Sequence, residues 1–202
     1  RNGTFLFFRG FMEYHSTRLR DASLIFMDDR GRIKGLLPAS WHSECQEIRS
    51  HGGLTYGGLV LASETHAVEA GEMYSFAMEY YVRKYHAHRL VVRPVPYIYH
   101  HQPSDDELYW LFRYGAKLCA SGLASVIDFC SPGPLAKQRK RCLNHALKNN
   151  LEVHEACIED TTAWSEYWNV LTEVLQSRHG VTPVHSLDDI TLLPKRFPDH
   201  IR

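Results

Sequence analysis

Short apolar runs bounded by turn residues fill the first part of the chain, a pattern typical of β-strands. Residues 5–15 are apolar and aromatic, and they predict a short helix with an irregular start. The sequence Asp-Asp-Arg-Gly at residues 28–31 predicts a tight turn, so the runs on either side of it should pair antiparallel. Strands are predicted at residues 23–27, 33–39, 47–50 and 59–62.

A period near 3.6 residues replaces the strand pattern after residue 65. Apolar side chains on one face predict a helix over residues 65–86, and they are Met73, Phe76, Ala77, Tyr80 and the stem of Lys84. A capping box, Ser-Asp-Asp-Glu, opens a second helix at residues 104–120. Its expected buried stripe is Leu108, Leu111, Phe112, Gly115, Leu118 and Cys119. Short strands at residues 90–92 and 125–129 follow the two helices.

The order of elements predicts an α/β (α+β) fold with a mixed, mostly antiparallel sheet flanked by helices. After it come a basic helix at residues 134–149, a strand at 151–153, an amphipathic helix from Trp164 to Gly180 and a short helix capped by Ser186. We expect three parts: a first domain over residues 1–130, a basic connecting helix over 131–150, and the truncated beginning of a second, similar domain over 151–202.

Charge and cysteine usage narrow the class of protein. Lys+Arg and Asp+Glu both number 23 in 202 residues, so the net charge is zero and no DNA partner is expected. The five cysteines form no C-x-x-C pair, which predicts buried or half-buried free thiols. His86-x-His88 and His100-His101 lack the spacing of a metal site. No transmembrane segment and no secretory signal are found, so we expect a cytoplasmic protein without a bound metal.

The glycine-rich segment Ser50–Gly58, with the sequence SHGGLTYGG, is the first candidate site. Glycines at this density mark positive φ, a bulge or close approach of the backbone to a neighbour or ligand. We consider both a strand bend and a ligand groove, with Ser50, His51, Thr55, Tyr56 and Gly57 as substrate-binding candidates. His51 is the one candidate for a catalytic proton acceptor, and a structural, hydrogen-bonded histidine is the favoured reading.

The aromatic segment at residues 96–101 is the second candidate site. It leaves a strand and enters a helix, and Tyr97 and Tyr99 alternate on one face, with His100 beside them. They are either substrate contacts or amphipathic rim residues. The helix at 134–149 carries five Lys and Arg residues and no acid. Arg141 on this helix is a candidate for binding a phosphate-bearing acceptor. The alternative interpretation is that the basic residues form a solvent-exposed face without a ligand.

The element order of residues 5–129 resembles one unit of the GNAT acyltransferase superfamily. Residues 137–153, KQRKRCLNHALKNNLEV, are similar to the inter-domain passage R-x-x-x-x-K-A-x-x-x-G-h-x-V of its two-domain FemAB-like branch, h being apolar. Residues 164–186 with Phe197-Pro198 resemble the opening helices of the second unit. The SHGGLTYGG and PYIYH segments resemble those of bacterial GNAT-type proteins.

This resemblance implies a transferase that moves an acyl group, such as N-acetyl or aminoacyl, to an amine. The acceptor would be a small molecule or a cell-envelope precursor. GNAT sites cradle the pyrophosphate of CoA on a Gly-rich loop that opens a helix, whereas the loop at residues 62–66 contains Glu64 and no glycine. We therefore expect acyl-CoA (acetyl-CoA) to bind the full-length protein but not this fragment, which would supply mainly the acceptor-side half.

Two classes of function stay open. The first is this acyltransferase, with acyl-CoA or aminoacyl-tRNA as donor and with catalytic residues that lie beyond Arg202. The second is a non-catalytic GNAT-like domain that binds a ligand or a partner, and a homo-oligomer is compatible with either. Because the fourth and fifth strands of a GNAT-like sheet splay apart, residues 50–58 and 97–101 are expected to line one shared cleft.

Overall fold

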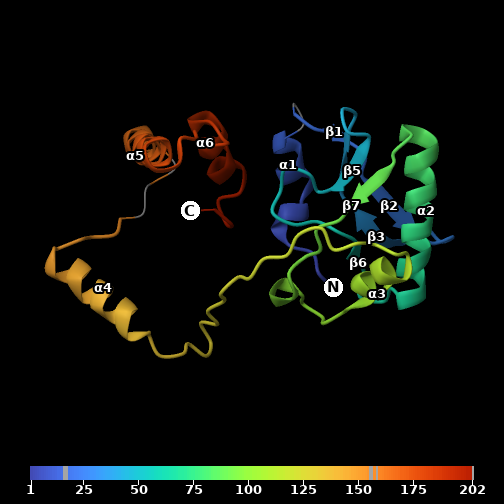
Figure 1. The fold of residues 1–202 in the computed structure, drawn as a ribbon, viewed down its shortest axis with the longest axis horizontal. Coiled ribbons are helices and arrows are strands. Elements are labelled where there is room, and N and C mark those ends of the chain that lie inside the picture. The colour runs from blue at the N-terminus through green and yellow to red at the C-terminus, as the bar shows by residue number, and fades with distance from the viewer. Residues whose placement is uncertain (16–17, 155–156, 158, 202) are drawn as a thin grey trace. The chain divides into compact units, whose positions relative to one another are not determined.

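The computed structural model describes residues 1–202 except residues 16–17, 155–156, 158 and 202. The chain divides into two compact units, Arg1–Leu118 and Cys119–Arg202 (Figure 1). The boundary expected at residue 130 lies inside the second of these units. Each unit is described separately below.

The first unit is an α+β domain whose short strands form two sheets. The N-terminal stretch predicted to be helical contains two 3-10 turns, η1 and η2, on either side of a single α-helical turn, α1. In chain order the elements are η1 Phe5–Phe7, α1 Arg9–Met12, η2 Glu13–His15, β1 Arg20–Asp21, β2 Leu24–Met27, β3 Ile33–Leu37, β4 Ala39–His42, β5 Glu47–Ser50, β6 Val60–Leu61, α2 Ala67–Tyr85, β7 Arg89–Val91, η3 Tyr97–Tyr99 and α3 Asp106–Arg113.

One sheet has the strand order β1-β4-β5-β7 and the other the order β2-β3-β6. All strand pairs are antiparallel except β5 with β7, which confirms the mixed, mostly antiparallel prediction. The predicted strand at residues 33–39 is split at Pro38, where the chain passes from one sheet to the other. Proline has no N–H for a ladder, so a strand ends readily there.

The first hairpin forms as its turn residues predicted. Leu24 of β2 lies opposite Leu37 of β3, and Phe26 lies opposite Gly35. The Asp28 carboxylate accepts hydrogen bonds from the backbone N–H groups of Arg30 and Arg32, and these bonds stabilise the turn. The turn is therefore stabilised by local sequence, as an Asx-type turn usually is.

Helices flank the strands, with α2 on one side and α1 on the other (Figure 1). The long helix at 65–86 is confirmed, but its buried face differs from the prediction. Ala70, Met73, Tyr74, Ala77 and Tyr81 are buried, whereas Phe76 is 56% exposed. The Tyr81 hydroxyl donates to the Ala22 carbonyl at 2.9 Å, and that of Tyr74 donates to a buried carboxylate. The two tyrosines turn inward because each hydroxyl finds an acceptor there.

The helix predicted at residues 104–120 ends at Arg113, and its expected buried stripe is wrong. Leu108, Phe112 and Leu118 are 54%, 79% and 85% exposed. The inward face of α3 instead carries Glu107, which is 8% exposed, together with the half-buried Trp110 and Leu111. The expected Ser104–Glu107 capping box is also absent, because the Glu107 carboxylate bonds to other elements.

The second unit contains three helices in its described residues: α4 Lys137–Lys148, α5 Thr161–His179 and α6 Leu187–Arg196. As predicted, α5 ends at Gly180 with φ of 65°, and Ser186 caps α6 in a reciprocal capping box with Asp189. The strands predicted at residues 125–129 and 151–153 are not formed. Phe129 is 89% exposed and Val153 98% exposed, and a strand without a neighbour to pair with has no stable ladder.

The cysteines are also placed differently from the expectation. All five are exposed, and not buried or half-buried. Cys119 and Cys130 lie in a stretch without regular secondary structure, and Cys142 lies on α4, which has no buried residue. A thiol has nothing to pack against in such segments.

Gly58 provides a test of how tightly the first unit is packed. Its φ is +85°, and a Cβ added there would overlap the Glu107 carboxylate. We expect Gly58→Ala to lower the free energy of unfolding by about 2 kcal/mol or more, from the left-handed backbone and the overlap together. Urea unfolding followed by circular dichroism measures this.

Gly122→Ala is the matched control, because a Cβ at Gly122 meets no atom within 4 Å. Its free energy of unfolding should stay within about 0.5 kcal/mol of the wild type. Equal stability of the Gly58 and Gly122 variants would contradict the packing described here.

Candidate functional site

Two of the pockets in the first unit contain residues singled out in the sequence. The larger, of about 260 Å³, is the His51 pocket, formed by α1, η2, β1, β4 and the start of the glycine segment. Its walls combine charged, polar and aliphatic side chains. They are Arg9, Met12, Glu13, Leu19, Arg20, Asp21, Ala39, Ser40, His51, Gly52 and Leu54.

His51 is buried and holds a left-handed backbone conformation, with φ of 52°. Its Nδ1 lies 2.5 Å from the Tyr56 carbonyl oxygen, and the Phe7 ring stacks on the imidazole at 4.9 Å. Because a carbonyl only accepts, Nδ1 carries the proton and Nε2 holds the lone pair of the neutral ring. The orientation of His51 is therefore set by the fold of the glycine segment itself.

The other candidates of the glycine segment have structural contacts. The Ser50 hydroxyl accepts from the Gly58 N–H at 2.5 Å, and the Gly57 N–H donates to the Arg93 carbonyl at 2.6 Å. The Tyr56 hydroxyl lies 3.0 Å from that of Thr4. Thr55 is exposed, and only its carbonyl is engaged, by Arg93. These contacts hold the segment against its neighbours, so four of the five candidates have an evident structural role.

Tyr97 and His100 line the second, smaller pocket of about 60 Å³, which we name the Glu107 pocket. Its volume has room for a few water molecules or a small polar head group. Its walls come from the N-terminus, β6, the segment after β7, and the start of α3. They are Arg1, Asn2, Leu59, Leu61, Pro94, Val95, Tyr97, His100, Ser104, Asp105, Glu107 and Leu108.

The two sequence-predicted segments touch each other but do not line one shared cleft. The rings of Tyr56 and Tyr99 pack at 5.4 Å, yet residues 51–54 line the His51 pocket and Tyr97 and His100 line the Glu107 pocket. The prediction that residues 50–58 and 97–101 line one shared cleft is therefore wrong. The strands β6 and β7 do separate, since they lie in different sheets and their segments meet at a single bridge, Gly57 with Pro94.

One ring nitrogen of His100, a residue that lines the Glu107 pocket, is without a hydrogen-bond partner among the described residues. Its Nε2 lies 3.2 Å from the Val95 carbonyl oxygen and must donate to it, which leaves Nδ1 as an acceptor in the neutral ring. Nδ1 is buried and has no hydrogen-bond partner among the described residues. A buried acceptor in this state is stabilised by any ligand that brings an N–H or O–H group.

Glu107 is the functional candidate that the sequence analysis missed. Its Oε1 accepts from the Leu59 N–H at 2.7 Å and from the Tyr74 hydroxyl at 2.5 Å. The spacing of Glu107, Trp110 and Leu111 on one helical face was the available signal. It was overlooked because an acidic residue in the first turn of a helix is usually a cap.

Burial without a compensating cation sets the protonation of Glu107. Burial raises its pKa to about 7, against the lowering effect of the hydrogen bonds from Tyr74 and Leu59. Burial also raises the pKa of Tyr74 well above its ordinary value, so that hydroxyl stays a neutral donor. A carboxyl group that titrates near neutral pH is suited to accept or release a proton.

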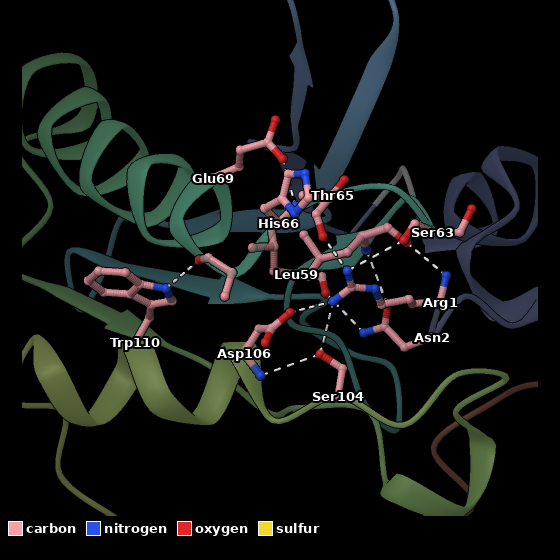
Figure 2. A network of polar contacts seen from close by, with 12 residues as sticks. Arg1, Asn2, Leu59, Ser63, Thr65, His66, Glu69, Ser104, Asp106 and Trp110 are labelled. Carbon is pink, nitrogen blue, oxygen red and sulfur yellow. Dashed lines mark hydrogen bonds and ion pairs between the residues drawn. The ribbon is translucent and has the colours of Figure 1, made fainter.

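A polar network around Arg1 fixes the start of α3 (Figure 2). Glu107 is the second residue of this helix. The guanidinium pairs with Asp106, donates to the Ser104 hydroxyl at 3.2 Å, and donates to the Thr65 carbonyl. The Asn2 side chain accepts from the Leu61 N–H and donates to the Leu59 carbonyl. The network thus ties the N-terminal segment, β6, the loop before α2 and α3 together.

The loop before α2 does not offer a pyrophosphate site. The carboxylate of Glu69 accepts from the His66 N–H at 2.6 Å and pairs with Lys34 at 2.9 Å, so the first turn of α2 already has an anion. Thr65 directs its carbonyl to Arg1, and its hydroxyl donates to the Lys34 carbonyl. A phosphate needs N–H donors and positive potential at such a position. The residues present therefore do not fit the CoA pyrophosphate.

Arg141 lies exposed on α4 in the second unit and lines neither pocket of the first. Among the described residues, no cluster of three His, Cys, Asp or Glu side chains is placed to hold a metal ion. The helices of the described chain include none long and apolar enough to cross a membrane.

Comparisons with known proteins do not add a family assignment. No protein-family model, no curated protein and no solved structure matches the chain. The resemblance to the GNAT superfamily thus remains a prediction from the sequence.

The raised pKa of Glu107 predicts how stability depends on pH. The unfolded carboxyl titrates near 4.5 and the folded one near 7, so the folded state binds the extra proton between these values. Stability should therefore be highest below pH 4.5 with respect to this group and fall as the pH rises to 7, by roughly 3 kcal/mol in total. Glu107→Gln, which keeps the acceptor oxygen, should remove this fall.

Urea unfolding gives the free energy of unfolding of the wild type and of Glu107→Gln from pH 5 to 8, and the difference between the two proteins is taken at each pH. The difference cancels the contribution of His42, whose pKa is lowered by burial and by Arg49. Glu72→Gln, at an exposed position of α2, is the control and should keep the wild-type pH dependence. Parallel curves for wild type and Glu107→Gln would show that Glu107 does not titrate in this range.

Proposed function

We propose that this chain carries the acceptor side of an N-acyltransferase, in which Glu107 receives the proton of an amine bound in the Glu107 pocket. The observation that carries the proposal is a buried carboxylate on the wall of a pocket, with hydrogen-bond donors on one oxygen and no cation paired with it among the described residues. The resemblance of the element order to a GNAT unit supports the reaction class.

The chemistry of amide formation explains why such a carboxylate is useful. An amine attacks an acyl carbonyl only through its nitrogen lone pair, and most alkylamines are protonated at neutral pH. A buried carboxylate attracts the ammonium form, and a group with a pKa of about 7 exchanges the proton at neutral pH. The Tyr74 hydroxyl and the Leu59 N–H hold the carboxylate in one orientation.

Two further residues of the pocket suit an amine. The acceptor Nδ1 of His100 is matched to an N–H group of the bound amine. Tyr97 is 59% exposed and packs against the His100 ring at 5.3 Å, so its face lies beside the pocket where a cation is attracted to an aromatic ring. These contacts would orient the amine before transfer.

The acyl donor is proposed to bind outside the first unit. The anionic Glu69 in the first turn of α2 and the engaged carbonyl of Thr65 argue against CoA there. Acyl-CoA or an aminoacyl ester held elsewhere in the intact protein would supply the acyl group.

The second candidate function is non-catalytic binding. The observation that favours it is the row of exposed apolar side chains at Tyr97, Ile98 and Tyr99, which are 59%, 54% and 46% exposed. Exposed aromatic residues in a row are common at recognition surfaces. In this case the Glu107 pocket would bind an amine or amide without transfer.

Activity of the intact protein tests the proposed function. A panel of alkylamines is supplied with acetyl-CoA and with an aminoacyl-tRNA, and amide formation is followed by mass spectrometry. Glu107→Gln should lower kcat/KM at pH 7 by about 10²–10⁴-fold, the usual effect of losing a proton acceptor. The loss should lie mainly in kcat, and the rise of rate through pH 7 should disappear.

Asp188→Asn, in the second unit on α6, is a charge-matched control and should leave kcat/KM unchanged. Transfer that proceeds equally well in Glu107→Gln would contradict the role of Glu107. No transfer with either donor, together with calorimetric binding of an amine that Glu107→Gln abolishes, would favour the binding function.

CoA binding to the chain of residues 1–202 is a separate prediction. Because the start of α2 is occupied by its own side chains, micromolar CoA should not raise the melting temperature of this chain. Differential scanning fluorimetry over a range of CoA concentrations measures this. A saturable increase would place the donor on the chain and contradict the acceptor-side assignment.

A further inference from the structure

A serine and a histidine are hydrogen-bonded to each other beside the His51 pocket. Ser40 and His42 stand two residues apart on β4, and Ser40 Oγ lies 3.0 Å from His42 Nε2. Alternate residues of a strand share a face, which explains why the two side chains meet. Ser40 is 4% exposed and lines the pocket, whereas His42 is half-buried behind it.

The direction of this hydrogen bond follows from its surroundings. Ser40 Oγ is also 3.4 Å from the Arg49 carbonyl, a longer contact than the one to His42. The shorter distance favours donation of the hydroxyl proton to His42 Nε2. Burial, together with the nearby charge of Arg49, lowers the pKa of His42, and so the ring is neutral and able to accept that proton at neutral pH.

Gly52 of the glycine segment packs closely against this pair. A Cβ added at Gly52 would overlap Ser40 Oγ and lie 3.0 Å from His42 Nε2, so only a residue without a side chain fits there. Gly52 lines the same pocket as Ser40. The backbone N–H group of Gly52 has no hydrogen-bond acceptor among the described residues. Backbone N–H donors next to a serine oxygen are the usual means of stabilising an oxyanion.

We propose that Ser40 and His42 form a nucleophilic dyad that accepts an acyl group from an activated ester or thioester in the His51 pocket. The acyl donor of this step is a small ester or thioester without the CoA pyrophosphate, and so it differs from the donor of the proposed function. The inference requires neither Glu107 nor an amine, and it therefore stands apart from that function. It assigns to the first unit a covalent acyl-transfer step of its own.

The acyl group moves to Ser40 without a change of oxidation state. Ser40 Oγ attacks the acyl carbonyl carbon, the Oγ–C bond forms, and His42 Nε2 takes the hydroxyl proton. The carbonyl oxygen becomes an oxyanion in the pocket that the backbone of Gly52 lines, where we expect the Gly52 N–H to stabilise it. The bond to the alcohol or thiol then breaks, and His42 returns the proton to the leaving group. Water or an amine later releases the acyl group from Ser40.

The pocket sets the class of acyl donor. Its walls combine aliphatic side chains, Met12, Leu19 and Leu54, with charged groups. These are Arg20 and Arg9, the latter paired with Glu13 and Asp21. Its volume of about 260 Å³ accommodates a short acyl chain with part of its leaving group. His42 Nδ1 has no carboxylate bonded to it among the described residues, so the pair is a dyad and a slow turnover is expected.

Acyl labelling of the full chain tests the proposal. The chain is incubated with p-nitrophenyl acetate at pH 7.5, and acetylation is located by peptide mass spectrometry. We expect one acetyl group on Ser40, together with a burst of p-nitrophenol. Ser40→Ala should lose both, and His42→Gln, which retains a hydrogen-bonding side chain, should slow labelling by about 10²-fold or more.

Ser43→Ala is the matched control, because Ser43 is exposed directly after β4 and should be irrelevant to labelling. Far-UV circular dichroism and the melting temperature show whether each variant folds, and Ser40→Cys replaces Ser40→Ala if the alanine variant does not. The cysteine variant should then form a thioester at position 40. A folded wild type with no acetyl group on Ser40, or His42→Gln that labels at the wild-type rate, would overturn the proposal.

Discussion

The close approach of a glycine backbone to polar side chains is the constraint on which the first unit depends. Gly52 lies against the Ser40–His42 pair, and Gly58 lies against the Glu107 carboxylate. Neither contact leaves room for a Cβ, and Gly58 also has a positive φ. One short segment therefore brings backbone without side chains against polar groups at both pockets.

The electrostatics of the carboxylates separates structural from functional roles. Glu47 is buried but pairs with Arg49 at 2.9 Å and Arg89 at 3.0 Å, and these partners lower its pKa. The Glu107 carboxylate instead has neutral donors, the Leu59 N–H and the Tyr74 hydroxyl, and burial raises its pKa. A paired carboxylate is a fixed part of the sheet, whereas Glu107 can change its charge near neutral pH. Burial, with no cation paired to the carboxylate among the described residues, makes Glu107 the candidate for proton transfer.

The polar network of Arg1 gives that candidate a fixed position. Arg1 and Asn2 bind β6, the loop before α2 and the start of α3 at once (Figure 2). The indole N–H of Trp110, in the middle of α3, donates to the Ala67 carbonyl at 2.5 Å and holds α3 against the start of α2. A site whose residues are held by a second layer of contacts keeps its geometry when a ligand enters.

Local features of the sequence were sufficient for the elements whose stability is local. The Asp28 turn, the extent of α2, the end of α5 at Gly180 and the Ser186 cap were predicted correctly, since each depends on neighbours a few residues away. The mostly antiparallel sheet followed from the order of these elements. For the candidate site, the sequence indicated the glycine segment and His100, but it did not indicate the residues that these contact in the fold.

Tertiary contacts decided the rest. The strands expected at 125–129 and 151–153 did not form, because an apolar run becomes a strand only where another strand pairs with it. The buried face of α2 was decided by acceptors for Tyr74 and Tyr81 that lie on distant segments. The sequence predicts Glu107 as a helix cap, whereas in the fold it is a buried acid. The reason is that its hydrogen-bond donors, Leu59 and Tyr74, are distant in the sequence and contact it only in the folded chain. The sequence thus determined the local elements, whereas long-range packing decided which polar groups became buried and reactive.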